Sequence, residues 1–375
     1  MMKCFIFFAL VAVAAAFVPV YIPTRDRIQG RYIVVLQDGV NANSVIDRFI
    51  RNVTVEANVK TTFEAVLNGF VVEADKDGIA LDLLQMLPGV KYIEEDSVVR
   101  AAGGQLIQTN SWGQDRIDQR DVQGDSRMIL EGYGTETHIY IIDTGINADH
   151  PDFSGRAFNV KDVIGGDGLD CNGHGMHMAG IAASETYGIA NRAKVYGVRA
   201  LDCDGLGTMA DVISGLEWVA NSGIRPLLIS MALAGPNSQA MIDAIAEAHQ
   251  RSSLVVVAAG NADDDACNTS PANAPDALTI ASSTVDDSRS FFSNWGECVD
   301  LFAPGSNIKS LGVDGEPSTF SGTSTACAHA IGAASAIMEN QHSHVGVIEQ
   351  MKRTASMDKI SDPKGTPNHL VYAGL

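Results

Sequence analysis

Positive charge is scarce in this 375-residue chain, which carries 26 lysine and arginine residues against 45 aspartate and glutamate residues. The formal charge of -19 repels the phosphates of nucleic acids and the headgroups of anionic lipids, so we expect neither a nucleic acid nor a membrane as a partner. The composition is otherwise that of a folded protein, because 46% of the residues are hydrophobic and 19% are charged. The length allows one large domain and a smaller companion.

Long apolar stretches are also missing after the first residues of the chain. Residues 1–16 combine a positive residue, Lys3, with an apolar run at 5–13 and small residues at 14–16, which is the pattern of a secretory signal peptide. The apolar run is too short to span a membrane, and no later stretch is long and apolar enough. We therefore expect a soluble protein that is secreted to the extracellular medium, and we expect it to act as a monomer.

The cysteine spacings that hold metal ions are absent, because the chain has no Cys-x-x-Cys pair and no Cys/His ligand spacing. Cys4 is expected to leave with the signal peptide, and five cysteines remain. An oxidising compartment favours disulfide pairing among the first four of these, which are Cys171, Cys203, Cys267 and Cys298. Cys327 is left over, either as a small buried hydrophobic residue or as a reactive thiol.

Residues 31–100 have the pattern of a small separate unit. Apolar strands are predicted at 32–36, 70–74 and 90–94, and helices are predicted between them at 45–53 and 79–87. This order of elements, in a unit of this size, is typical of a ferredoxin-like α/β domain. The polar, glycine-bearing stretch that follows at 100–104 is either a linker or a processing site.

The rest of the chain alternates short apolar strands with helices. Strands rich in Val, Ile and Leu are predicted at 138–142, 194–199, 227–231, 254–258 and 278–281, with amphipathic helices at 209–221 and 238–251. Continuous apolar strands of this kind predict a doubly wound, mainly parallel α/β sheet with helices on both faces. In such sheets, functional side chains gather at the carboxyl ends of the strands.

Three side chains of this second unit follow the order aspartate, histidine, serine, which can make a serine nucleophilic. Asp143 directly follows a strand, His174 lies in a glycine-rich turn, and Ser324 stands at the start of a helix of small residues. The imidazole can act as general base, and the carboxylate can orient it. Asn261, in a Gly-Asn turn after another strand, can donate to an oxyanion.

Each of these residues also has a plainer interpretation. Ser324 can be an ordinary helix N-cap, Asp143 and Asn261 can be turn residues, and His174 can be bonded to a backbone carbonyl. His177, one helical turn after His174, is expected to have a structural role. The occurrence of all four candidates in one chain favours catalysis.

Eight short motifs occur in an order that strengthens this interpretation. They are Asp143-Thr144-Gly145-Ile146, His150-Pro151, Gly173-His174-Gly175, Tyr187-Gly188-Ile189-Ala190, Ala258-Ala259-Gly260-Asn261, Phe292-Ser293-Asn294-Trp295-Gly296, Ala303-Pro304-Gly305 and Gly322-Thr323-Ser324. With them, most of the chain resembles the subtilisin-like serine proteases, in particular the aqualysin-like members of the proteinase K branch. The unit at 31–100 resembles the inhibitory propeptide of that family. After the signal peptide expected at 1–16, the resemblance implies a propeptide at 17–104 and a subtilisin-like catalytic domain at 105–375.

The resemblance also implies a role for each candidate residue. Ser324 would attack the peptide carbonyl, His174 would carry the proton, Asp143 would orient His174, and Asn261 with the Ser324 backbone N–H would hold the oxyanion. Residues 205–207 and 233–235 would pair with the substrate backbone. Ala258 and Gly260, near the end of a neighbouring strand, would line the pocket for the side chain before the cut bond. The substrate-binding residues would be Gly205, Leu206, Gly207, Leu233, Ala234, Gly235, Ala258 and Gly260.

Two further features are implied by the same resemblance. Cys171 would pair with Cys203, and Cys267 would pair with Cys298. A structural calcium ion, Ca2+, would be held by the backbone carbonyls of Pro275 and Ala277 and by the carboxylate of Asp300, since oxygen ligands suit this ion.

The chain departs from the family pattern at five places near the candidate site. Met176 stands where threonine is usual, Thr325 where methionine is usual, and Ala328 where proline is usual. Cys327 replaces a small residue, and Ala234 occupies a place that glycine usually holds. The sequence around Ser324 also resembles a secreted convertase branch that keeps its propeptide after self-processing and acts as a binding protein.

The sequence thus predicts a secreted, calcium-stabilised serine endopeptidase that is made as a zymogen. It would act on protein or peptide substrates with an aliphatic or aromatic residue before the cut bond, and its own propeptide would be its intramolecular inhibitor. Self-cleavage is expected within residues 100–106. The alternative is a self-processed binding protein that retains its propeptide; a pseudoenzyme is disfavoured, because all four candidate side chains are present.

Overall fold

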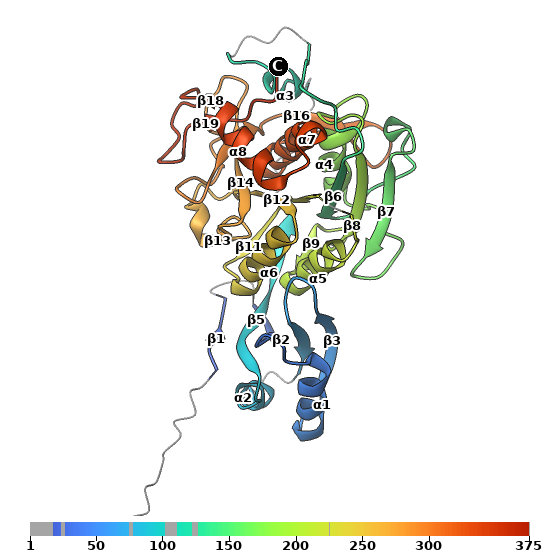
Figure 1. The fold of residues 1–375 in the computed structure, drawn as a ribbon, viewed down its shortest axis with the longest axis vertical. Helices are drawn as coiled ribbons and strands as arrows, with labels where there is room; N and C mark the ends of the chain where they lie inside the picture. Colours follow the sequence, from blue (N-terminus) through green and yellow to red (C-terminus); the bar gives the residue numbers. More distant parts are fainter. Residues whose placement is uncertain are drawn as a thin grey trace, which may run out of the picture.

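The computed structural model of the chain describes residues 18–23, 27–74, 78–101, 111–121, 127–224 and 226–374. A small N-terminal unit, coloured blue, lies against a larger unit that runs from green to red (Figure 1). The expected signal peptide at 1–16 and Cys4 lie outside the described residues, and so does residue 102 onward of the expected cleavage stretch.

The small unit is a sheet covered on one face by two helices. Its elements are β1 (Val20–Tyr21), β2 (Arg27–Leu36), α1 (Ala42–Asn52), β3 (Asn58–Phe63), β4 (Gly69–Glu73), α2 (Ile79–Gln85) and β5 (Val90–Ala101). The strand order β5-β2-β4-β3, with the helices after β2 and β4, is the ferredoxin-like arrangement that the sequence predicts. Phe49 of α1 and Leu84 of α2 pack on Val34, Phe70 and Ile93 of the sheet.

Two details of this unit differ from the prediction. Strand β3 was not expected, because every second residue of this edge strand faces solvent and the segment has no apolar run. Helix α1 begins earlier than the apolar spacing predicts, because the side chain of Asn41 accepts a hydrogen bond from the backbone N–H of Ser44 and caps the helix there.

The large unit is built on one long sheet with the strand order β18-β19-β15-β14-β12-β10-β6-β8-β7. Strands β15 to β7 in this order are paired in parallel, as the sequence predicts. The strands are β6 (His138–Asp143), β7 (Ala157–Asp162), β8 (Lys194–Arg199), β10 (Leu227–Met231), β12 (Ser253–Ala258), β14 (Ala277–Ser283), β15 (Leu301–Pro304), β18 (Ser356–Met357) and β19 (His369–Leu370). Strands β10 and β12 are buried at every residue, because helices cover both of their faces.

Helices lie on both faces of this sheet. They are α3 (Gly113–Arg116), α4 (His174–Ala183), α5 (Met209–Ala220), α6 (Gln239–Gln250), α7 (Thr323–Gln341) and α8 (His344–Thr354), with short 3-10 helices at Pro151–Phe153 and Ala266–Asn268. Helices α4, α7 and α8 share one core with the sheet, and α5 and α6 share the other. Small residues let α4 and α7 approach closely; a Cβ on Gly332 would lie 3.0 Å from the carbonyl oxygen of Ala182.

Strand β5 connects the two units. It continues beyond the small sheet and pairs with β9 (Leu206–Thr208) and β11 (Leu233–Pro236) of the large unit, and β13 (Thr269–Ser270) pairs with the far side of β11. Strands β16 (Ile308–Leu311) and β17 (Pro317–Phe320) form a separate hairpin. The small unit is therefore joined to the large one through a shared sheet (Figure 1).

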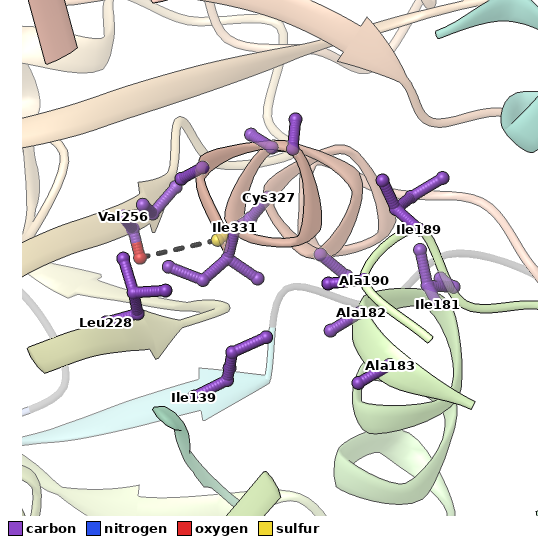
Figure 2. Packing of buried hydrophobic residues seen from close by; sticks show 14 of the residues in the cluster. Ile139, Ile181, Ala182, Ala183, Ile189, Ala190, Leu228, Val256, Cys327 and Ile331 are labelled. Atoms are coloured by element: carbon purple, nitrogen blue, oxygen red, sulfur yellow. Dashed lines mark hydrogen bonds between the residues drawn. The ribbon is translucent and has the colours of Figure 1, made fainter. Parts of the chain in front are cut away.

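The cysteines follow the pairing that the family resemblance implies. Disulfides join Cys171 to Cys203 and Cys267 to Cys298. Cys327 is free and fully buried on α7, where its Sγ lies 3.4 Å from the carbonyl oxygen of Val256 and donates to it (Figure 2). Burial raises the pKa of this thiol to about 12, so it packs as a small core residue.

Across the described ranges, none of the helices combines the length and the apolar character that a membrane crossing requires.

We expect Cys327 to remain unmodified when the folded chain is treated with iodoacetamide at about pH 8, because the buried thiol stays protonated and out of reach. Peptide mass spectrometry should find the same residue fully alkylated after denaturation. Rapid alkylation of Cys327 in the folded chain would contradict its structural role.

Candidate active site

Asp143 is the last residue of β6 and lies fully buried at the carboxyl end of the sheet. One of its carboxylate oxygens accepts a hydrogen bond of 2.8 Å from the backbone N–H of Thr144. Its backbone carbonyl accepts from the N–H groups of Ala200 and Leu201, which follow β8. The carboxylate is thus fixed by the two strands at the edge where ligands of parallel sheets bind.

His174 is the first residue of α4, and its ring faces this carboxylate. Its Nδ1 lies 2.7 Å from one Asp143 oxygen and 2.9 Å from the other. Since a carboxylate can only accept, Nδ1 carries the proton and Nε2 is left as the basic nitrogen. Burial by itself lowers the pKa of His174, but the charge and hydrogen bond of Asp143, with a smaller contribution from Asp170, outweigh it and raise the pKa above 6.5.

Asp170 is a second buried carboxylate that holds the turn before α4, and sequence reasoning missed it. Its Oδ1 accepts from the Thr144 hydroxyl at 2.9 Å and from the backbone N–H of Gly173 at 2.8 Å, and its Oδ2 accepts from the N–H of Met176 at 2.7 Å. It therefore fixes the helix start that carries His174 relative to the end of β6. The Asp-x-x-Gly spacing was the available signal, because aspartate often caps such turns.

His177 has the structural role that was expected of it. Its Nε2 lies 3.1 Å from the carbonyl oxygen of Ile308, and its ring stacks on Phe320 at a centroid distance of 4.2 Å. Burial lowers its pKa to about 3, so the ring stays neutral.

Ser324 is the second residue of α7 and is fully buried. Gly322 occupies the N-cap position, and no side chain of the described residues caps the helix, so the interpretation of Ser324 as an ordinary N-cap is wrong. The Ser324 hydroxyl and the Nε2 of His174 are both buried, and neither has a hydrogen-bond partner among the described residues. Buried polar atoms are rarely left without partners, and active sites are one place where they occur.

Asn261 lies in the turn after β12, and its side chain is anchored to the start of α7. Its Oδ1 accepts from both the backbone N–H and the hydroxyl of Thr323, each at 2.9 Å. With the amide oxygen occupied, the Nδ2 group is the donor that remains for a ligand. Thr323 also accepts from the N–H of Gly260 at 3.1 Å, and sequence reasoning did not recognise its part in joining β12 to α7.

The predicted substrate-binding segments pair with the end of strand β5. Val99 and Arg100 lie opposite Gly207 and Leu206 on one side, and Arg100 and Ala101 lie opposite Ala234 and Leu233 on the other. The last residues of the small unit are therefore held between two antiparallel strands of the large one.

Val99 fills an apolar pocket between these strands. Its side chain is fully buried, and a Cβ on Gly235 would lie 2.6 Å from its Cγ1 and 3.3 Å from the Cε of Met209. Gly205 forms the turn before β9 with a φ of +73°, while Ala258 and Gly260 are buried at the end of β12 beside Asn261.

Carboxylates from both units complete the contact between them. Glu94 and Asp96 of β5 accept from the backbone N–H groups of Ala240 and Ala210, near the starts of α6 and α5. Glu217 of α5 accepts in return from three consecutive N–H groups of residues 64–66, at 2.9, 2.6 and 2.7 Å. The first N–H groups of a helix have no partner within the helix, so the bonds from Glu94 and Asp96, together with those of Glu217, hold the small unit on α5 and α6.

Asp300, the one side chain among the residues predicted to hold calcium, is paired with a lysine. The Asp300 Oδ1 lies 2.7 Å from the Nζ of Lys352, and its Oδ2 accepts at 2.8 Å from the backbone N–H of Thr279. Both carboxylate oxygens are therefore engaged, one of them by a positive charge. Within the described ranges, no group of three or more His, Cys, Asp or Glu side chains is arranged to hold a metal.

Replacing Asp170 by asparagine should lower the pKa of His174, because it removes a negative charge that stabilises the imidazolium. NMR titration of the imidazole resonances measures this pKa. Asp152→Asn is the control, since Asp152 caps a turn at Thr186 and is not among the groups that raise the His174 pKa. An unchanged His174 pKa in the Asp170 variant would refute the electrostatic part of its role.

The chain is similar to known protein families and to individual known proteins. Residues 134–370 match the Subtilase family, and residues 31–102 match Peptidase inhibitor I9. Alkaline serine exoprotease A of Vibrio alginolyticus is 38% identical over 94% of this chain and 68% of its own length, and the cuticle-degrading protease of Metarhizium anisopliae is 36% identical over 95% and 93%.

A solved structure, that of a cold adapted subtilisin-like serine proteinase, covers 71% of this chain and 99% of its own with a TM-score of 0.69 and 43% identity. The family match includes the segments of Asp143, His174, Asn261 and Ser324, and the inhibitor match includes nearly all of the small unit. The chain therefore belongs to the subtilase family of subtilisin-like serine proteases and carries an I9 propeptide inhibitor domain at its N-terminal side.

Proposed function

We propose that this chain is a secreted serine endopeptidase, made as a zymogen that cuts its own propeptide. The observation that carries the proposal is the position of β5, which lies between β9 and β11 as an extended peptide would lie in a protease cleft. The paired residues Val99, Arg100 and Ala101 reach into the stretch 100–106 in which the cut is expected.

Ser324 is proposed as the nucleophile and His174 as its base. The hydroxyl oxygen forms a bond to the peptide carbonyl carbon while its proton passes to the His174 Nε2. The Nδ1–H bond to Asp143 keeps Nε2 free for this proton and stabilises the imidazolium that forms. The imidazolium then protonates the leaving amine as the C–N bond breaks, and water releases the acyl group from Ser324 by the same steps.

The oxyanion of the tetrahedral intermediate needs donors that are in place before the reaction. The Nδ2 group of Asn261 is oriented by the two bonds from Thr323 to its Oδ1. The backbone N–H of Ser324, in the first turn of α7, is the second donor that we propose. One donor is anchored by the bonds from Thr323 and the other belongs to α7, so little reorganisation is needed when charge develops on the carbonyl oxygen.

The departures from the family pattern around Ser324 are compatible with this proposal, because their side chains pack or bond within the fold. The hydroxyl of Thr325 donates to the carbonyl oxygens of Gly305 and Gly322 at 2.9 and 2.8 Å. Cys327 and Ala328 are fully buried in the core of α7. None of these three residues stands in the place of a side chain that takes part in the proposed reaction.

We propose domain limits of 1–16 for the signal peptide, 17–104 for the propeptide and 105–375 for the catalytic domain. The two disulfides support secretion, since such bonds persist in oxidising compartments. The relatives include a protein named extracellular serine proteinase from Thermus. The apolar pocket around Val99 favours substrates with an aliphatic residue at the equivalent position.

The tight contact of the propeptide also supports the alternative, a self-processed binding protein that keeps its propeptide. Strand pairing, two carboxylates at helix starts and the Glu217 contacts all oppose its release. The two functions differ in whether Ser324 becomes accessible after the cut.

A serine-directed fluorophosphonate should label the secreted, processed protein at Ser324. Labelling should vanish in Ser324→Ala and persist in Ser321→Ala, a control in the same turn whose hydroxyl accepts from the Asn307 N–H instead. A processed chain that resists labelling and co-purifies with its propeptide would favour the binding protein. If the wild-type chain is neither processed nor labelled, both proposals fail.

Glu217→Gln should speed the release of the propeptide roughly 10-fold, because it replaces a charged acceptor of three backbone N–H groups by a neutral one. The lag before activity appears in the secreted protein measures this release. Glu247→Gln is a matched control on α6, since Glu247 pairs with Arg251 of the same helix. Equal lags in both variants would show that Glu217 does not hold the propeptide.

A further inference from the structure

The Asp300 carboxylate makes a contact that neither catalysis nor propeptide binding uses. Lys352 stands in the last turn of α8, and its Nζ lies 2.7 Å from the Asp300 Oδ1. The Asp300 Oδ2 accepts from the Thr279 N–H at 2.8 Å, and the Asp300 N–H donates to the Thr279 carbonyl at 2.9 Å. One carboxylate therefore ties the end of α8 to strand β14.

This arrangement conflicts with the calcium ion that the family resemblance implies at Asp300. Calcium binds roughly six to eight oxygen atoms at about 2.3–2.6 Å. An ion at that distance from Oδ1 would lie beside the Lys352 ammonium, and the two positive charges would repel each other. Lysine has no acceptor and cannot serve as a ligand while it is protonated.

Burial does not keep a calcium ion from Asp300, because both side chains of the ion pair remain open to solvent. The Asp300 side chain is 24% exposed and that of Lys352 is 45% exposed. An ion from solution has access to the carboxylate, so the competition is decided by charge. The other expected ligands are Pro275, which lies just before β14, and Ala277, which is its first residue.

We propose that the Lys352 ammonium takes the place of calcium at Asp300. The positive charge that neutralises the carboxylate is supplied by the chain itself, and α8 is held on β14 without an ion. The stability of this contact is then independent of calcium, and removal of the Lys352 charge creates a calcium site from residues already present. This inference does not depend on the proposed protease activity.

Calcium binding to four forms of the full chain tests the proposal. The parent form carries Ser324→Ala, which keeps the sample uncleaved, and the others add Asp300→Asn, Lys352→Met, or both changes. Isothermal titration calorimetry gives the number of ions bound, and the melting temperature in chelator and in calcium gives their effect on stability. Lys359→Met is the matched control, because Lys359 makes a similar surface ion pair of 2.7 Å with Asp121.

The parent and its Asp300→Asn form should bind the same number of calcium ions. Lys352→Met should bind one more, and calcium at about 100 times its Kd should raise its melting temperature by roughly 5 °C relative to the parent's response. The additional ion and the rise in melting temperature should both vanish when Asp300→Asn is added to Lys352→Met. Neither should be seen in Lys359→Met, or in Lys352→Arg, which keeps the positive charge. Loss of one ion from the parent on Asp300→Asn, or no gain in Lys352→Met, would overturn the proposal.

Discussion

The close packing of helices α4 and α7 on one face of the parallel sheet is the constraint on which the candidate site depends. Small residues of α7, and Gly and Ala residues of α4, let the two helices approach each other and the strands (Figure 2). His174 begins α4 and Ser324 lies in the first turn of α7. Hydrogen bonds tie the first helix start to the end of β6 and the second to the turn after β12, so both candidate side chains lie at the same edge of the sheet.

The propeptide uses the same edge in a different way. It contributes a strand to the cleft and carboxylates to two helix starts, and it receives Glu217 in return. Backbone pairing of this kind is tolerant of side-chain identity, while the pocket that encloses Val99 selects for an apolar residue. One surface can therefore serve both as the inhibitor site and as the proposed substrate site.

Much of this organisation could be predicted from the sequence, because parallel strands and small-residue helices leave strong local patterns. Five central strands of the large sheet, and the position of Asp143 at a strand end, follow from short runs of Val, Ile and Leu. The features that could not be predicted depend on contacts between residues that are far apart in the sequence. Asp170 acts by bonding Thr144, 26 residues away, and Lys352 reaches Asp300 across 52 residues. The edge strand β3 was missed because half of it faces water.

The most direct test of self-processing by Ser324 is the N-terminus of the secreted protein, read by intact-mass analysis and N-terminal sequencing. Besides removal of the signal peptide, the arrangement of β5 between β9 and β11 predicts one cut within residues 100–106 in the wild-type chain, and a secreted Ser324→Ala chain that still carries its propeptide. The same cut within residues 100–106 in both chains, or separation of the propeptide by a cut outside this stretch, would contradict it.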